Sequence, residues 1–144
     1  ETNPKPGSMS TEKILDIPGL AAHSRQLRAE GKRVVLCHGT FDLMHTGHIR
    51  YLQRAKQEAD VLLVTVTGDA YVNKGPGRPV FREHLRAENL AALACVDFVA
   101  INQAVSAVEA LHEPEILHWN RLPSKRTADT FSIPTKSRSV PVAC

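Results

Sequence analysis

Two histidines stand in a stretch that could bind phosphate groups. Residues 39–48 read GTFDLMHTGH and place His45 and His48 three positions apart. At the start of a helix this spacing brings two side chains to the same side, with about 5–6 Å between their Cβ atoms. Gly39 lets a ligand approach the backbone, and Gly47 does the same at the opening of the helix, where free N–H groups attract anions. Two imidazoles and a helix N-terminus would therefore meet at a point that suits a polyphosphate.

Residue types and spacing alone leave other interpretations of this stretch open. The two histidines could be surface residues of an amphipathic helix or a zinc pair, although no CxxC or third ligand is evident beside them. Asp42 is interpreted as a cap or loop-bonding residue rather than as a catalytic base. Thr40 and Phe41 would line the pocket, and Phe41 could instead belong to the core.

The elements that must position this stretch alternate between strands and helices. Apolar runs predict strands, and apolar residues at helical spacing predict helices. The predicted strands are 33–38, 61–66 and 97–101. The predicted helices are 18–30, 46–58, 82–94 and 103–111, and in the third of them Leu85, Leu90 and Leu93 are expected to face inward. Residues 67–81 form a glycine- and proline-rich loop. This alternation is typical of parallel sheets with right-handed crossovers. We expect a doubly wound, Rossmann-like α/β fold, which binds ligands at the carboxyl ends of its strands.

Length and composition indicate one globular domain. The chain has 144 residues, of which 42% are hydrophobic and 23% charged. Gly7-Ser8-Met9 resembles a cloning junction, so residues 1–8 are set aside as foreign to the fold. We expect an N-terminal helical segment at 9–32, the main domain at 33–119 and an irregular tail at 120–144. Cys37 and Cys95 fall in predicted buried positions, and reduced, buried thiols are expected there.

The charge distribution limits the choice of partners. Residues 120–144 carry a net charge of +4, and the rest of the chain carries −1. A basic face on the folded part is therefore not indicated, and no nucleic-acid partner is expected. The longest apolar run, VLLV at 61–64, is far shorter than a membrane span, and the N-terminus is not a secretory signal. We expect a soluble, cytoplasmic protein without a membrane partner.

The stretch GTFDLMHTGH resembles the (G/T)xFDxxHxGH signature of the cytidylyltransferase-like nucleotidyltransferases. A lone HxGH would be weak, but Gly39, Phe41 and Asp42 before it, a preceding strand and a later basic loop make it specific. The likeness extends over residues 33–101, about half of the chain. The resemblance rests on the segments GTFDLMHTGHIRYLQRAK, VTVTGD, NKGPGRPV and LACVDFV. These segments are more similar to the heptose-phosphate branch than to glycerol-3-phosphate cytidylyltransferase.

The resemblance implies transfer of CMP or AMP from a nucleoside triphosphate to a sugar or polyol phosphate, with release of pyrophosphate. Mg²⁺ would accompany the triphosphate, and a homodimer is expected. The implied catalytic residues are His45, His48 and Lys74, and the implied nucleotide-binding residues are Gly39, Thr40, Phe41, His45, Gly47, His48, Arg86 and Asp97. From the residues alone, Lys74 could be a solvated loop charge, Arg86 one more exposed helix charge and Asp97 only the start of a strand.

The last third of the chain departs from the family pattern. In the family, a Lys-Gly element follows the fourth strand, and a Ser/Thr-rich turn then opens a helix that grips the triphosphate. Here residues 115–119 are followed by no Lys-Gly element, and 132–136 echo the turn only faintly. The alternative function is therefore a nucleotide-binding module or an inactive relative. A class I aminoacyl-tRNA synthetase fragment, which has a similar HxGH, is excluded by length and by the lack of a tRNA-binding surface. Arg78, His84 and Trp119 receive no role.

Overall fold

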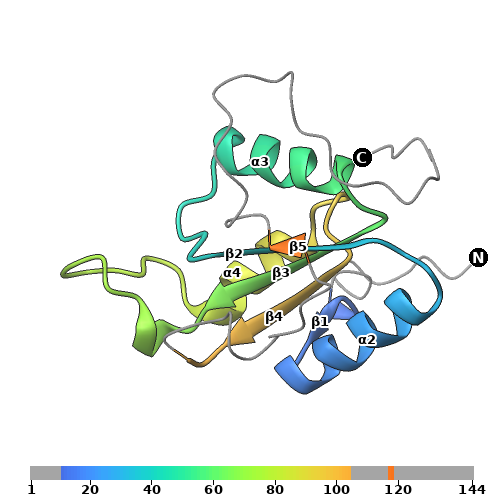
Figure 1. The fold of residues 1–144 in the computed structure, drawn as a ribbon. Helices are drawn as coiled ribbons and strands as arrows, with labels where there is room; N and C mark the ends of the chain where they lie inside the picture. Colours follow the sequence, from blue (N-terminus) through green and yellow to red (C-terminus); the bar gives the residue numbers. More distant parts are fainter. Residues whose placement is uncertain (1–10, 105–116, 119–144) are drawn as a thin grey trace, which may run out of the picture.

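The centre of the molecule is a parallel sheet, seen in the computed structural model, which describes residues 11–104 and 117–118 (Figure 1). The strands are β1 (Ile14–Leu15), β2 (Val34–Gly39), β3 (Val61–Thr67), β4 (Phe98–Asn102) and β5 (Leu117–His118). Within the described residues their order is β1-β4-β3-β2-β5, and every pair is parallel. The predicted α/β fold with a parallel sheet is confirmed.

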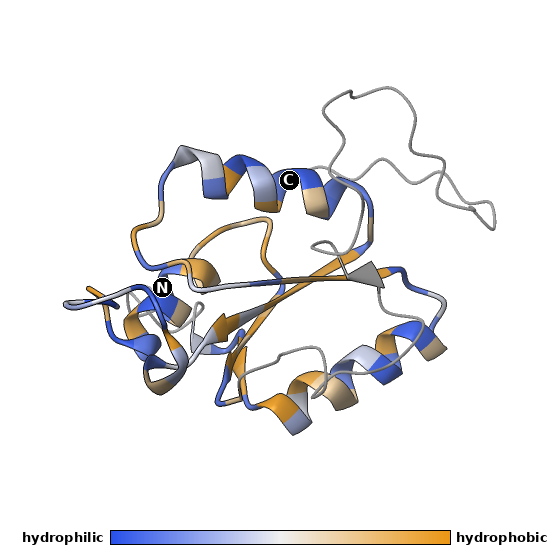
Figure 2. Ribbon diagram, turned by 60° about the vertical axis from the view of Figure 1, so that its left-hand side comes forward, coloured by the Kyte–Doolittle hydropathy of each residue, from blue (hydrophilic) through white to orange (hydrophobic). Residues whose placement is uncertain are grey.

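Helices cover both faces of the sheet (Figures 1 and 2). The helices are α2 (Ile17–Ala29), α3 (Thr46–Gln57) and α4 (Glu83–Ala91), with a short 3₁₀ helix η1 (Asp69–Tyr71) after β3. α2 lies on one face, and α3 and α4 lie on the other. The predicted helix at 103–111 falls almost wholly outside the described residues. β1 was not predicted, because two residues are too few to show a strand periodicity.

Each face of the sheet has its own apolar core. On the α2 face, Leu20 packs with alternate residues of β2 and β3, among them Leu36 and Leu63. On the other face, Leu52 of α3 and Leu90 of α4 pack against the intervening strand residues. Cys37 and Cys95 are buried as predicted, and burial raises the pKa of Cys37 to about 12. No helix in the described ranges is long and apolar enough to cross a membrane.

The buried side of α4 differs from the prediction. Leu85, expected to face the core, is 41% exposed, whereas Arg86 is fully buried with Ala87, Leu90 and Ala91. Leu93 lies beyond the end of the helix and packs against the core from there. The buried positions of α4 were predicted incorrectly because an arginine occupies one position of the buried side, where periodicity alone expects an apolar residue.

The strand order indicates where a ligand would bind, at the end of β2. From β2 the chain moves to β3 and then to β4 on one side, while β5 pairs with β2 on the other side. The direction of the crossovers therefore reverses at β2. In open parallel sheets, ligands bind outside the carboxyl ends of the strands at such a reversal. The end of β2 at Gly39 is that point in this fold.

Candidate active site

The turn that leaves β2 is shaped by a buried aromatic ring. Phe41 has a φ of 47°, which is unusual for a residue with a side chain and costs about 1–3 kcal/mol. This conformation folds its ring back under Gly39, where an added Cβ would lie 2.9 Å from the ring carbon Cε2. Phe41 is 6% exposed, so it belongs to the core rather than lining the pocket, and its ring meets His48 edge-on at 5.7 Å. Its contribution to the site is to support His48.

The two histidines cap the helix that carries them. The Nδ1 atom of His45 accepts a hydrogen bond from the Gly47 N–H at 3.0 Å, and the Nδ1 atom of His48 accepts one from the His45 N–H at 3.3 Å. A neutral imidazole that accepts at Nδ1 carries its proton at Nε2. The ring centroids are 4.1 Å apart. The α3 N-terminus therefore holds two neighbouring rings whose remaining Nε2–H groups are available as donors.

Gly47 is required for this arrangement. A Cβ at this position would lie 2.7 Å from Cε1 of the His45 ring. Any other residue would push the imidazole away from the cap and separate the two rings. The expected part played by Gly47, to keep the helix opening accessible, thus has a specific steric basis in this chain.

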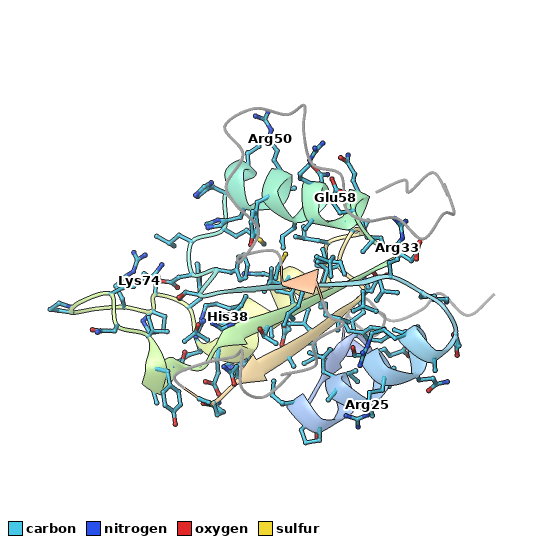
Figure 3. All side chains as sticks on the ribbon, in the orientation of Figure 1. Arg25, Arg33, His38, Arg50, Glu58 and Lys74 are labelled. Atoms are coloured by element: carbon cyan, nitrogen blue, oxygen red, sulfur yellow. The ribbon has the colours of Figure 1, made fainter. Side chains whose placement is uncertain are left out.

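Lys74 lies at the same end of the sheet as the two histidines (Figure 3). It is exposed on the loop between η1 and α4 and projects toward the end of the sheet at which β2 ends (Figure 3). Partial burial lowers the pKa of His48 below its ordinary value of 6.5, and the charges of His45 and Lys74 lower it further. His48 is therefore neutral near pH 7, a state that preserves the donor at Nε2 and the acceptor at Nδ1.

Asp42 fastens the loop that bears Lys74. Its carboxylate is 3% exposed and accepts hydrogen bonds from the N–H groups of Val80 and Phe81, each at 2.9 Å. Arg78 forms an ion pair with it at 3.1 Å. Burial would raise the pKa of Asp42, but the two N–H donors and the charges of Arg78 and Arg86 outweigh it and hold the pKa below its ordinary value. The interpretation of Asp42 as a loop-bonding residue is confirmed.

Arg86 lies behind the site rather than in it. Its guanidinium donates from Nε to the Phe81 carbonyl (2.9 Å), from Nη1 to the Thr40 (2.8 Å) and Thr67 (2.7 Å) carbonyls and from Nη2 to Asp69 (2.8 Å). Its side chain has no exposed surface in this structure, so a nucleotide contact of Arg86 stays a prediction that this burial does not support. Arg86 instead joins the ends of β2 and β3 to the loop. Thr40 is half-buried and supplies one of these carbonyls.

Asp97 lies at the end of the sheet opposite to the end of β2. It precedes the first residue of β4, where it accepts hydrogen bonds from Lys56 Nζ at 2.6 Å and from the Leu62 N–H at 2.7 Å. A strand of five residues separates the two ends by roughly 17 Å. The nucleotide contact of Asp97 stays a prediction that this position does not support, and the alternative of a strand-start residue fits the observed hydrogen bonds.

Two polar groups near the site were not assigned a role from the sequence. Arg78 was given no role, although a charged residue in a glycine- and proline-rich loop could have indicated an ion pair such as the one with Asp42. His38 interrupts an apolar strand, and its Nδ1 lies 2.9 Å from Thr65 Oγ1 on the α2 face. Burial lowers the pKa of His38, while a hydrogen bond to the backbone of Thr65 opposes the shift. A histidine within an apolar strand could have indicated such a buried polar pair.

Together these features define a class of protein. A parallel sheet whose crossovers reverse at β2, two imidazole donors on a helix N-terminus there and a lysine at the same end of the sheet suit the phosphates of a nucleotide. They are the features expected of a nucleotidyltransferase with an HxGH motif. In the described residues no group of three or more His, Cys, Asp or Glu could hold a metal ion.

Comparison with known proteins gives the family. Residues 36–120 match the model described as cytidylyltransferase-like, and the chain belongs to this family, which confirms the expected class of nucleotidyltransferase. The bifunctional protein HldE of Geobacter metallireducens is 46% identical over 96 residues, which cover 65% of this chain and 20% of that protein. HldE of Halorhodospira halophila is 49% identical over 88 residues, which cover 60% and 18%. The chain thus matches about a fifth of the length of these relatives.

A solved structure agrees with this assignment. The lipopolysaccharide core biosynthesis protein of Thermoplasma volcanium superposes with a TM-score of 0.52 at 28% identity. The superposition covers 56% of this chain and 66% of that one. The relatives therefore include a protein of carbohydrate biosynthesis, in agreement with the likeness to the heptose-phosphate branch.

Proposed function

We propose that the protein transfers a nucleoside monophosphate, CMP or AMP, from a nucleoside triphosphate to a sugar phosphate of the heptose phosphate class, with a polyol phosphate as the next choice. The observation that carries this proposal is the pair of Nε2–H donors of His45 and His48 at the N-terminus of α3. The charge of Lys74 acts on the same site, since it lowers the pKa of His48. The name of the Thermoplasma relative and the matches to HldE support a sugar phosphate as the acceptor.

The chemistry requires no covalent intermediate. An oxygen of the acceptor phosphate attacks the α-phosphorus, and the bond from that phosphorus to the pyrophosphate oxygen breaks. Negative charge grows on the α-phosphoryl oxygens and on the leaving oxygen. Donors that are already oriented stabilise this charge without reorganising, which is the largest catalytic term in many enzymes. His45 and His48 meet this need, because their caps hold both Nε2–H groups in place.

The Mg²⁺ that accompanies the triphosphate would be held mainly by the phosphates of the substrate rather than by side chains of the protein. The candidate residues at the end of β2 are donors and a lysine, and Asp42, the nearby carboxylate, is already engaged by backbone N–H groups and Arg78. Mg²⁺ in proteins is commonly held by substrate phosphates with few protein ligands. It would neutralise part of the triphosphate charge when bound. The imidazoles and Lys74 would then contact phosphate oxygens left outside its coordination.

A second candidate is a nucleotide-binding module without transferase activity. The observation that favours it is the absence, in the sequence after β5, of the family's Lys-Gly element. Such a protein would bind a triphosphate at the end of β2 and make no product.

The experiment that separates the two candidates is a product screen with radiolabelled CTP and ATP against several sugar and polyol phosphates. The transferase predicts labelled nucleoside diphosphate sugar or polyol and stoichiometric pyrophosphate with at least one pair. Calorimetry with CTP or ATP and Mg²⁺ supplies the binding measurement. Binding without product under all pairs would favour the module, and no binding at millimolar concentration would overturn the site itself.

A further inference from the structure

The loop that carries Lys74 is fixed at both ends by buried polar groups. At its start, the Asp69 N–H donates to Glu83 at 2.7 Å, and the Asp69 carboxylate accepts from Arg86 at 2.8 Å. At its far end, Val80 and Phe81 donate to Asp42. Residues 73–77 between these anchors are all exposed, so apolar packing contributes little to their position.

The two oxygens of Asp42 have different partners. Oδ1 accepts from the N–H groups of both Val80 and Phe81, whereas Oδ2 faces Nε of Arg78 at 3.1 Å and shares the Val80 N–H. Oδ1 therefore holds the end of the loop to the turn after β2. Oδ2 reaches further back into the loop through Arg78, which is four residues from Lys74. The same turn leads from Asp42 to His45, so one carboxylate joins the histidine segment to the lysine segment.

We propose that Asp42 is a positioning residue, which through Arg78 holds the loop so that Lys74 faces His45 and His48 and completes the phosphate-binding side of the site. Asp42 is buried and its lone pairs are engaged, so it does not touch substrate itself. Arg78 in turn compensates a buried carboxylate and thereby fixes the backbone on which Lys74 stands. The influence of the Lys74 charge on His48 agrees with this placement. This positioning role depends on the proposed transferase function only for the expected loss of turnover.

The substitution Asp42→Asn separates the two roles of the carboxylate. The Asn carbonyl can occupy the Oδ1 position and keep both backbone N–H donors, while its NH₂ group meets Arg78, another donor. The end of the loop would stay attached, and only the connection to Arg78 would be lost. Arg78→Gln removes the same connection from the other side, at a residue that is partly exposed and therefore tolerant of substitution. Asp60→Asn is the matched control, because Asp60 accepts the Arg33 N–H at 2.8 Å and pairs with its guanidinium at the opposite end of the sheet.

The test measures three quantities in the full chain: the pKa of His48 by NMR, the affinity for inorganic pyrophosphate, and kcat and KM for the nucleotide. In Asp42→Asn and Arg78→Gln we expect the pKa of His48 to rise toward 6.5, as it should in Lys74→Met. We expect pyrophosphate binding to weaken about tenfold and kcat/KM to fall about 10- to 100-fold, since small misplacements of binding groups have effects of this size. The double variant should be no worse than either single one, because both remove one interaction.

The outcomes separate this proposal from the proposed function. If Asp42 were only structural, Asp42→Asn and the Asp60→Asn control would both lower Tm, and His48 and pyrophosphate binding would not respond; that result overturns the proposal. If the protein makes no product at all, the pKa of His48 and the pyrophosphate affinity still test the placement of the loop. Additive losses in the double variant would show that Asp42 and Arg78 act separately, which also contradicts it.

Discussion

At the scale of single residues, each site histidine uses one ring nitrogen for the fold and leaves the other for a ligand. The Nδ1 atoms of His45 and His48 form the cap of α3, so the rings cannot rotate without breaking it. We expect His45→Ala and His48→Ala each to lower kcat by about 10²–10³, the effect of removing one oriented transition-state donor. Loss of the cap itself would cost about 1 kcal/mol of stability.

The measurement is steady-state kinetics together with calorimetry of nucleotide binding. Affinity should change far less than kcat, because the charge that these donors meet develops during the reaction. His23→Ala is the control, since His23 lies on α2, on the other face of the sheet. Equal losses in affinity and in rate would identify the two histidines as ordinary binding groups.

His38 predicts a pH dependence of stability. Burial holds its pKa below the ordinary 6.5, and His48 is shifted in the same direction. Below pH 6.5 the unfolded chain takes up protons that the folded chain does not, so the free energy of unfolding decreases as the pH falls from 6.5 through the folded pKa values. Asp42 and Asp60 have lowered pKa values and act only near and below pH 4.

Urea denaturation between pH 7 and 5 measures this effect. The wild-type chain should lose stability over that interval, and His38→Gln, which keeps a partner for Thr65, should lose less. A stability that is level from pH 7 to 5 in the wild type would contradict the burial of neutral histidines. A slope that His38→Gln leaves unchanged would assign the effect to His48 instead.

At the scale of elements, the loop between η1 and α4 contributes its charges to the site and little to the core. Lys74 is exposed, and it forms no ion pair or hydrogen bond within the described part of the chain. We therefore expect Lys74→Ala to leave Tm nearly unchanged while it lowers affinity for the triphosphate or the acceptor phosphate. Thermal denaturation and calorimetry decide the matter, and a destabilised variant with full activity would defeat the assignment.

Strands and helices were predictable where a pattern extends over several residues. VVLC and VLLV are buried on both sides, and their apolar runs predicted β2 and β3 within a residue or two. The apolar pattern did not reveal the buried side of α4, because Arg86 is one of the residues buried there. Its guanidinium donates to carbonyls from three separate segments. Those carbonyls converge only in the folded chain. The place of Asp97 was not predictable for a related reason: a family likeness gives a position along the chain, whereas the end of the sheet at which a residue lies follows from the topology.

At the scale of the whole molecule, the site is assembled by the parallel pairing of β2 with β3. Their register brings Gly39 opposite Val66, so the turn with the histidines and the segment that leads to Lys74 leave the sheet side by side. Arg86 and Asp42 then join these two segments through hydrogen bonds to backbone groups. The HxGH stretch could be recognised from sequence, whereas this joining could not, because each partner is a backbone group without a sequence signature.

The last prediction concerns residues 120–144, which carry the net charge of +4 and no pattern that could bury a face. The strands and helices that the structure describes lie within residues 11–118, so deletion of 120–144 should leave a folded protein with a similar Tm. If the protein is a transferase, its triphosphate-gripping turn must come from elsewhere in the chain, and Thr135 with Lys136 are the nearest candidates in sequence. The deletion should then abolish turnover while calorimetry still detects nucleotide at the end of β2.

Sedimentation of the intact and shortened chains also tests the predicted homodimer. Full activity in the shortened chain would mean that the body alone holds a complete site, and Lys136→Ala in the full-length protein separates loss of that one cation from loss of the segment.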